Sequence, residues 1–291
     1  MFKKVLAIFL ALAMLLSFTA CGDGAGGNAG LPSAEEIIER AVGALDGIKT
    51  YQFDMDMNMD MAGEVEGEVF EATIAIDLSG AIDLENRQMM MDMTVSTTMS
   101  GEGEMEASGE IYLIGDMVYT MVGDPEMGSM WSKSEMPEGT WEVMNQVEPQ
   151  VDLLELAQVE VVGSEKVGDV DCYVLKLTPD MEQLWQLAMQ QSGMAGEGLL
   201  FRMLTDVDEE FLQEVFKSFS VKQWIAKDTY LLTRAEMDIA MELTPEAMGF
   251  PEEEGLVTMD TAVDLLAYSY NQPVSIVLPP EAEGATEVPM G

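Results

Sequence analysis

The chain has 291 residues, with 54 acidic against 13 basic side chains and a formal net charge of −41. It contains no histidine, which excludes Ser-His-Asp and Cys-His nucleophiles and histidine-ligated zinc. The acidic balance argues against nucleic acid as a partner, because phosphates would be repelled. The hydrophobic fraction of 48% is too high for a disordered acidic chain, so we expect a folded core.

Residues 1–20 have the pattern of a secretory signal peptide: two lysines, an apolar stretch over 5–16, and small residues before Cys21. This pattern resembles a bacterial lipobox with Cys21 as the acylated residue. It predicts an extracytoplasmic lipoprotein that is anchored to the bacterial cell membrane through lipidated Cys21. An ordinary secreted protein cut near Ala20 is the alternative. If Cys21 is acylated, Cys172 has no cysteine left for an intramolecular disulfide.

After the signal, residues 21–32 are rich in Gly and Ala and are predicted to form a flexible tether. A helix is expected to begin after Ser33, because Ser33 and Glu36 match a capping box ahead of apolar residues at helical spacing. We predict one domain over 33–282 and a polar tail over 283–291.

From residue 51 the apolar period changes to two. Met55, Met57 and Met59 alternate with acidic or amide residues, which is typical of an antiparallel strand with one face in water. The same alternation predicts further strands or hairpins at 70–78, 89–95, 105–121, 159–179, 221–226, 230–243 and 256–270, with a last extended piece at 273–278. A Gly-, Pro- and Ser-rich break is expected at 124–139.

Three central segments, 141–159, 180–191 and 199–219, are predicted to be mostly helical. Many antiparallel strands with helices clustered in the middle predict an α+β fold rather than alternating strand and helix units. A single sheet with one solvent-exposed face must curve to bury its apolar face, and the central helices are expected to pack inside the curve. We expect no membrane-spanning segment after the signal.

Five segments carry a family resemblance: 111–119 (IYLIGDMVY), 130–133 (MWSK), 168–175 (GDVDCYVL), 224–232 (WIAKDTYLL) and 271–282 (NQPVSIVLPPEA). They resemble the LolA/LppX-like (LprG-like) bacterial lipoproteins over most of residues 33–282. The resemblance implies a strongly curved antiparallel half-barrel with helices packed on its concave face. It also implies either carriage of lipids or acylated molecules or use as an envelope sensor, with no catalytic residues.

The dry faces are the predicted binding surface. Methionine is unbranched and adaptable, so Met55, Met57 and Met59 can line a pocket for acyl chains. A second candidate group comes from the central segments: Leu184, Trp185, Leu200, Met203, Phe211 and Phe216. A Gly-bearing loop between those segments can act as the hinge of a lid. Plain core packing is the competing interpretation for both groups, because hollow and filled barrels share one apolar pattern.

Other chemistries are disfavoured by the residues. Asp54, Asp56 and Asn58 begin like a calcium loop, but Met59 and Val65 stand where Gly and Glu are required, so a solvated strand face is preferred. Copper binding by Met thioethers is disfavoured, because the sequence has no histidine to accompany them as a ligand. Catalytic motifs are absent from the sequence, so we expect no enzyme, no cofactor and no metal.

The sequence thus predicts a lipoprotein whose partners are a membrane, through its lipid anchor, and a lipid or acylated ligand. The alternative is an envelope interaction or sensor protein on the same scaffold, whose acidic surface docks a basic partner.

Overall fold

The computed structural model describes residues 30–65, 68–101, 103–124, 128–136, 141, 157–179, 215–244 and 255–288. Six of the predicted site residues lie outside these ranges: Cys21, Leu184, Trp185, Leu200, Met203 and Phe211. The signal peptide and most of the tether lie outside them as well.

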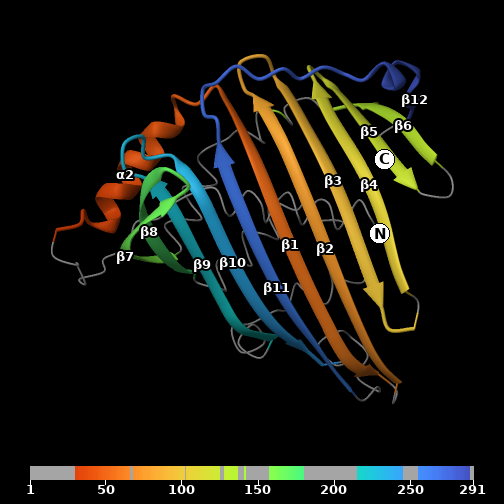
Figure 1. Ribbon diagram of the computed structural model, residues 1–291, viewed down its shortest axis with the longest axis horizontal. Helices are drawn as coiled ribbons and strands as arrows, with labels where there is room; N and C mark the ends of the chain where they lie inside the picture. Colours follow the sequence, from red (N-terminus) through yellow and green to blue (C-terminus); the bar gives the residue numbers. More distant parts are fainter. Residues whose placement is uncertain are drawn as a thin grey trace. The chain divides into compact units, whose positions relative to one another are not determined.

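The described residues form one helix, α2, and twelve strands that belong to a single sheet (Figure 1). Their bounds are α2 (Ala34–Leu45), β1 (Thr50–Val65), β2 (Glu68–Asp83), β3 (Gln88–Met99), β4 (Gly103–Ile114), β5 (Met117–Asp124), β6 (Gly128–Glu135), β7 (Ala157–Val167), β8 (Val170–Pro179), β9 (Phe216–Ala226), β10 (Leu232–Leu243), β11 (Gly255–Tyr268), the 3-10 turn η1 (Pro280–Gly284) and β12 (Thr286–Glu287). The strand order is β12-β6-β5-β4-β3-β2-β1-β11-β10-β9-β8-β7.

The predicted α+β fold class is wrong, because the described chain is dominated by this sheet. The expected helix over 199–219 runs into β9, where Phe216 pairs with Met241 and Phe219 pairs with Ile239. A register shift between Ala240 and Met241 inserts an extra residue into β9. Such a bulge puts residues three apart on the same face, so the spacing of Phe216 and Phe219 imitates a helix.

Two other predictions also differ from the structure. The end of the expected helix over 141–159 is the start of β7, and the expected break at 124–139 contains β6. β6 pairs with β5 along its whole length, so strand pairing outweighs its Gly- and Ser-rich composition. The remainder of the three predicted helices, 142–156, 180–191 and 199–214, lies outside the described residues.

Several predicted elements are confirmed. The helix α2 begins after Ser33, whose hydroxyl oxygen accepts a hydrogen bond from the Glu36 amide at 3.1 Å. The hairpins at 105–121 and 159–179 turn at Gly115 and Gly168, which have φ values of 61° and 57°. Glycine adopts this left-handed conformation without a steric penalty. The strands expected at 51–61, 70–78 and 89–95 lie in β1, β2 and β3.

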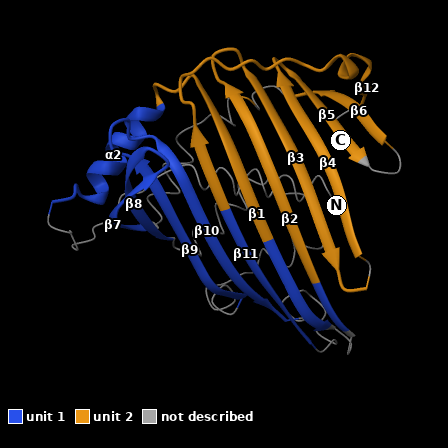
Figure 2. Ribbon diagram, in the orientation of Figure 1, with its two compact units in different colours: residues 1–45, 59–71, 147–263 blue, residues 46–58, 72–146, 264–291 orange. Residues whose placement is uncertain are grey.

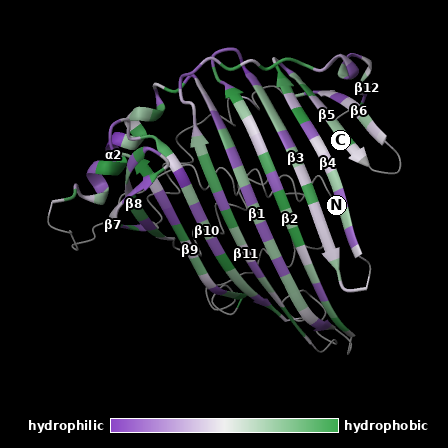
Figure 3. Cartoon of the chain, in the orientation of Figure 1, coloured by the Kyte–Doolittle hydropathy of each residue, from purple (hydrophilic) through white to green (hydrophobic). Residues whose placement is uncertain are grey.

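Two compact units divide the chain (Figure 2). Unit 1 comprises Met1–Leu45, Met59–Glu71 and Val147–Val263, and unit 2 comprises Asp46–Asn58, Ala72–Gln146 and Asp264–Gly291. The strands β1, β2 and β11 contribute to both units, whereas β7 to β10 belong to unit 1 and β3 to β6 belong to unit 2. Hydropathy alternates residue by residue along the strands, as expected for two-faced sheets (Figure 3).

The C-terminal segment of unit 2 lies across the ends of its strands. Ile276 forms a buried cluster with Ala81 and Tyr112, against which Trp131 also packs. Beyond it, Thr286 of β12 adds a short parallel pairing to the edge of β6. This segment therefore covers the apolar side chains of Ala81 and Tyr112 and part of the edge strand β6.

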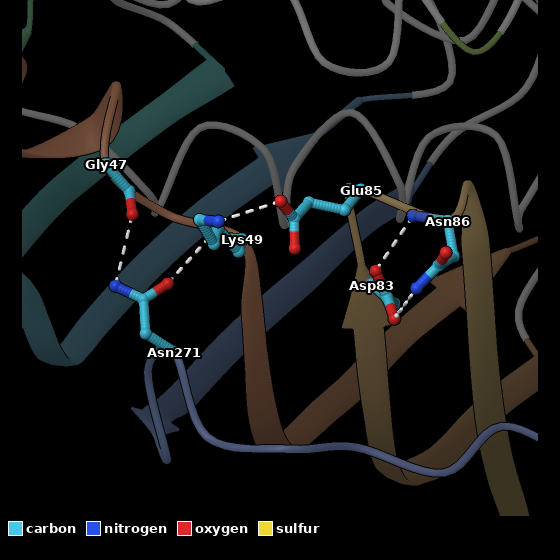
Figure 4. Close-up of polar contacts among 6 residues, drawn as sticks. All are labelled: Gly47, Lys49, Asp83, Glu85, Asn86 and Asn271. Atoms are coloured by element: carbon cyan, nitrogen blue, oxygen red, sulfur yellow. Dashed lines mark hydrogen bonds and ion pairs between the residues drawn. The ribbon is translucent and has the colours of Figure 1, made fainter.

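Asn271 fixes the start of that segment (Figure 4). Its side-chain oxygen accepts a hydrogen bond from the Lys49 amide at 2.7 Å, and its side-chain nitrogen donates to the Gly47 carbonyl at 3.1 Å. Nearby, Asp83 accepts two hydrogen bonds from Asn86, at 2.9 and 2.7 Å. These contacts order the rim of unit 2. Among the residues that the structure describes, no helix has the length and apolar character needed to cross a membrane.

Candidate functional site

The candidate site begins with the methionines of β1. Met55 and Met57 are each only 4% exposed, and Met59 is half-buried, whereas Asp56 and Asn58 between them are exposed. The alternation predicted from the sequence is therefore confirmed along β1, with one dry face and one wet face.

The neighbouring strands extend this dry face within unit 2. A Cβ atom on Gly80 of β2 would lie 2.6 Å from the ring of Phe53 and 2.7 Å from the Met90 carbonyl oxygen, so only glycine fits beneath the ring. Phe53 and Gly80 therefore share a face. Gly80 pairs with Met91 of β3, and Met91 pairs with Ile111 of β4.

We call this surface the methionine face of unit 2. Strand alternation places its buried members together on one side of β1 to β4: Met55, Met57, Ile76, Met89, Met91 and Leu113. Four of these six side chains are methionines, which adapt their shape more readily than branched residues do. Its outer part is exposed at Met105, Val122 and Met130, of which Val122 and Met130 pair directly.

Unit 1 has its own apolar face on β8, β9 and β10. Leu175, Ile225, Ala235 and Met237 are all at most 2% exposed. Phe216, at the start of β9, is half-buried. Of the predicted site residues, Met55 and Met57 thus lie together in unit 2, whereas Met59 and Phe216 belong to unit 1.

Two members of these faces were missed from the sequence as site residues. Gln223 on β9 is 0% exposed, and Thr261 on β11 is also buried. The sequence does contain an indication that Gln223 is buried. It stands midway between Val221 and Ile225, at a position where the alternation of β9 predicts a buried apolar side chain.

The opposite side of unit 2 is rich in carboxylates. Although much of Asp56 is exposed, its pKa is raised, first by desolvation and then by a hydrogen bond with Asp77. The negative charges of Asp77, Asp264 and Asp54 add to this shift. In the described ranges, no group of three or more Asp, Glu, Cys or His side chains is arranged to hold a metal ion.

Cys172 is fully buried in a small cluster with Val174 and Trp224. Burial raises the pKa of its thiol, so the reactive thiolate is disfavoured. The Trp224 ring nitrogen donates a hydrogen bond to Glu165 at 3.0 Å, and the Arg234 guanidinium lies 5.0 Å from the ring centroid. The surroundings of Cys172 therefore indicate packing rather than nucleophilic chemistry.

A family model matches residues 33–287, and its description is a family of unknown function, DUF6612. The chain belongs to this family. A comparison of the DUF6612 chain with curated proteins finds no match.

The DUF6612 chain is also similar to solved structures. The lipoprotein LppX of Mycobacterium tuberculosis has 13% identity and a TM-score of 0.38, with 83% of this chain and 97% of that chain covered. LprF of Mycobacterium bovis has 11% identity and a TM-score of 0.39, with 84% and 95% covered. A putative outer membrane lipoprotein-sorting protein domain from Vibrio parahaemolyticus has 12% identity and a TM-score of 0.22, with 82% and 93% covered.

Proposed function

We propose that the DUF6612 chain is an extracytoplasmic lipoprotein, anchored to the cell membrane by acylated Cys21, that binds or carries a lipid or acylated ligand. The observation that carries the proposal is the methionine face of unit 2. Adaptable apolar side chains gathered on one face of a sheet suit a ligand with variable acyl chains.

Binding is proposed to occur by burial, with no bond made or broken. Acyl chains leave water for apolar side chains such as Met57 and Met91, and each Å² of apolar surface removed from water contributes roughly 25 cal/mol. The carboxylates on the other side of β1, such as Asp56, stay in contact with water. This two-sided arrangement keeps a chain that carries an apolar ligand dispersed in water.

The first test is native mass spectrometry of the full chain purified from membranes of its own host. We expect a covalent mass increase at Cys21 and, in addition, a non-covalent adduct with the mass of an acylated molecule. A Cys21→Ser variant, which lacks the proposed anchor and is therefore purified from whole cells, separates the two, because it loses the covalent increase and keeps the adduct. Repeated preparations with no adduct would contradict ligand carriage.

A pair of neighbouring variants locates the ligand on the sheet. Met57→Gln places an amide on the methionine face, and Asn58→Gln makes a comparable change on the wet face of the same strand. We expect the first to reduce the adduct at least tenfold and the second to leave it unchanged, with circular dichroism confirming that both variants fold. Equal adducts in the two variants would place the ligand elsewhere.

The second candidate function is that of an envelope interaction or sensor protein. It is favoured by the carboxylates of Asp56, Asp77 and Asp264, whose mutual repulsion a cationic partner would relieve. This function predicts that the chain binds polylysine and that the double variant Asp56→Asn/Asp77→Asn binds it more weakly at low salt. Equal binding by the variant and the wild-type chain would exclude this surface.

A further inference from the structure

A row of apolar side chains crosses the side of unit 2 that is opposite to the methionine face. Because side chains alternate along a strand and Gly80 lies on the methionine face, Ala81 points to the other side. Ala81 pairs with Met90 of β3, and Met90 pairs with Tyr112 of β4. Tyr112 pairs in turn with Tyr119 of β5. The row therefore runs across the neighbouring strands β2 to β5.

Trp131 of β6 adds a third aromatic ring to this row. It packs against the buried cluster that contains Tyr112, and the centroids of the two rings lie 6.0 Å apart. We call the five side chains the aromatic patch: Ala81, Met90, Tyr112, Tyr119 and Trp131. Tyr and Trp, which form most of this patch, are the residue types enriched where binding energy concentrates in protein–protein interfaces.

The next row on the same side of unit 2 is acidic. Asp92 follows Met90 by two positions, and it pairs across the sheet with Glu110. Burial, and then the charges of Glu110 and Asp92, raise the pKa of Tyr112 to about 12. Acidic residues are usual on a sheet side that faces water, so the aromatic patch beside them marks a surface that another segment covers.

Residues 273–280, which we call the strap, cover the aromatic patch (Figure 1). Ile276 is buried in the cluster of the patch, and Val274 and Leu278 pack against that cluster. Val277, between two of these residues, is 71% exposed. Alternate side chains of the strap therefore contact the sheet, as in an extended peptide that is bound through every second residue.

The strap is held by its side chains rather than by its backbone. Among the described residues, the backbone hydrogen bonds that join the C-terminal segment to the long strands lie outside the strap. The Asn271 amide donates to the Thr50 carbonyl, and the Val288 amide donates to the Lys133 carbonyl, each at 2.8 Å. Prolines within the strap have no N–H group to donate. The fit of the strap thus depends on which side chains it presents to the patch.

We propose that the aromatic patch is a recognition site for an extended, proline-flanked apolar segment of a partner protein, and that the strap occupies this site in the free chain. Extended proline-containing segments bind aromatic surfaces at a small entropic cost, because they are largely preformed. The partner's segment needs an apolar residue where the strap has Ile276. The strap lowers the apparent affinity for the partner, because binding requires chains in which the patch is open. This site is separate from ligand carriage, since the methionine face lies on the other side of the sheet.

The test measures binding of a fluorescent peptide with the sequence of the strap, PVSIVLPP, to the full chain. Ile276→Ser weakens the packing of the strap and leaves the aromatic patch unchanged. We expect this variant to bind the peptide at least tenfold more tightly than the wild type does in fluorescence anisotropy, because the strap competes less. The matched control is Val277→Ser, which changes the exposed neighbour, and its affinity should equal that of the wild type.

A second peptide, with serine in place of its isoleucine, should bind none of these chains. Circular dichroism confirms that the variants fold. Equal affinity of folded Ile276→Ser and wild type for PVSIVLPP would overturn the inference, as would equal binding of the two peptides. If Ile276→Ser does not fold, Ile276→Val, which removes a single methylene group, should give a smaller gain in affinity, and no gain in that variant would also overturn the inference.

Discussion

The apolar faces of the two units are built differently. In unit 1, Leu175 and Ala235 are 0% exposed and Met237 is 1% exposed, with Gln223 among them. In unit 2, methionines such as Met57 predominate at slightly higher exposure. The face of unit 1 is therefore tightly packed and includes the buried amide of Gln223. The face of unit 2 is more adaptable, because methionine tolerates repacking better than leucine does.

The polar faces differ as well. In unit 1, Lys222 pairs across the sheet with Lys176 on one side and Glu236 on the other, so charges of both signs are interspersed. In unit 2, the cross-strand neighbours of Asp92 are Ser79 and Glu110. Burial raises the pKa of Asp92. At these positions, negative charge is therefore compensated by neighbouring lysine in unit 1 and is left beside another acidic residue in unit 2.

The largest expected effect separates the two apolar faces. Leu175→Ala should lower the free energy of unfolding by about 4 kcal/mol, because its fully buried, well-packed site cannot collapse around the cavity. Met91→Ala in unit 2 should cost about 2 kcal/mol, because neighbouring methionines can fill part of the space. Urea unfolding measures both, and a greater loss for Met91→Ala would reverse the comparison.

The next effect tests the rim of unit 2. Asn271→Gly should cost about 2 kcal/mol, because it removes the side-chain hydrogen bonds to Lys49 and Gly47. Asn271→Ala should cost about 1 kcal/mol more, because Asn271 has a φ of 56°, which alanine disfavours. Equal melting temperatures for the two variants would show that the backbone conformation contributes nothing.

The smallest effect concerns the acidic face. The pKa of Asp56 in the fold lies above its ordinary value of 3.8, so its ionised form destabilises the folded state. Asp56→Asn should therefore raise stability near neutral pH, by a few tenths of a kcal/mol after solvent screening. That gain should disappear as the pH falls through the folded pKa to below 3.8, where the carboxyl is protonated in both states.

Thermal unfolding at several pH values measures this gain. Asp238→Asn is the matched control in unit 1, where Asp238 is exposed on β10 opposite Ser220, and we expect it to leave stability unchanged. A gain in Asp56→Asn that persists at low pH would mean that charge is not its cause.

Much of the fold could be predicted from local patterns. The helix start after Ser33 and the alternation of Met55 and Met57 with polar residues each depend on neighbours in sequence, and both are confirmed. The bulge that turns Phe216 and Phe219 to one face depends on pairing with a distant strand, so the spacing alone indicated a helix. Gln223 was overlooked as a site residue because its burial follows from β8 and β10 on either side.

The position of β1 in the sheet has a consequence for biosynthesis. β1 is made first, yet it lies between β2 and β11, and β11 is the last long strand to leave the ribosome. One edge of β1 therefore stays unpaired until nearly the whole chain has been synthesised, and contacts between such distant segments form slowly. During this delay the unpaired edge and its apolar side chains are open to aggregation. We therefore expect the nascent protein to depend on a chaperone that shields that edge until synthesis is complete.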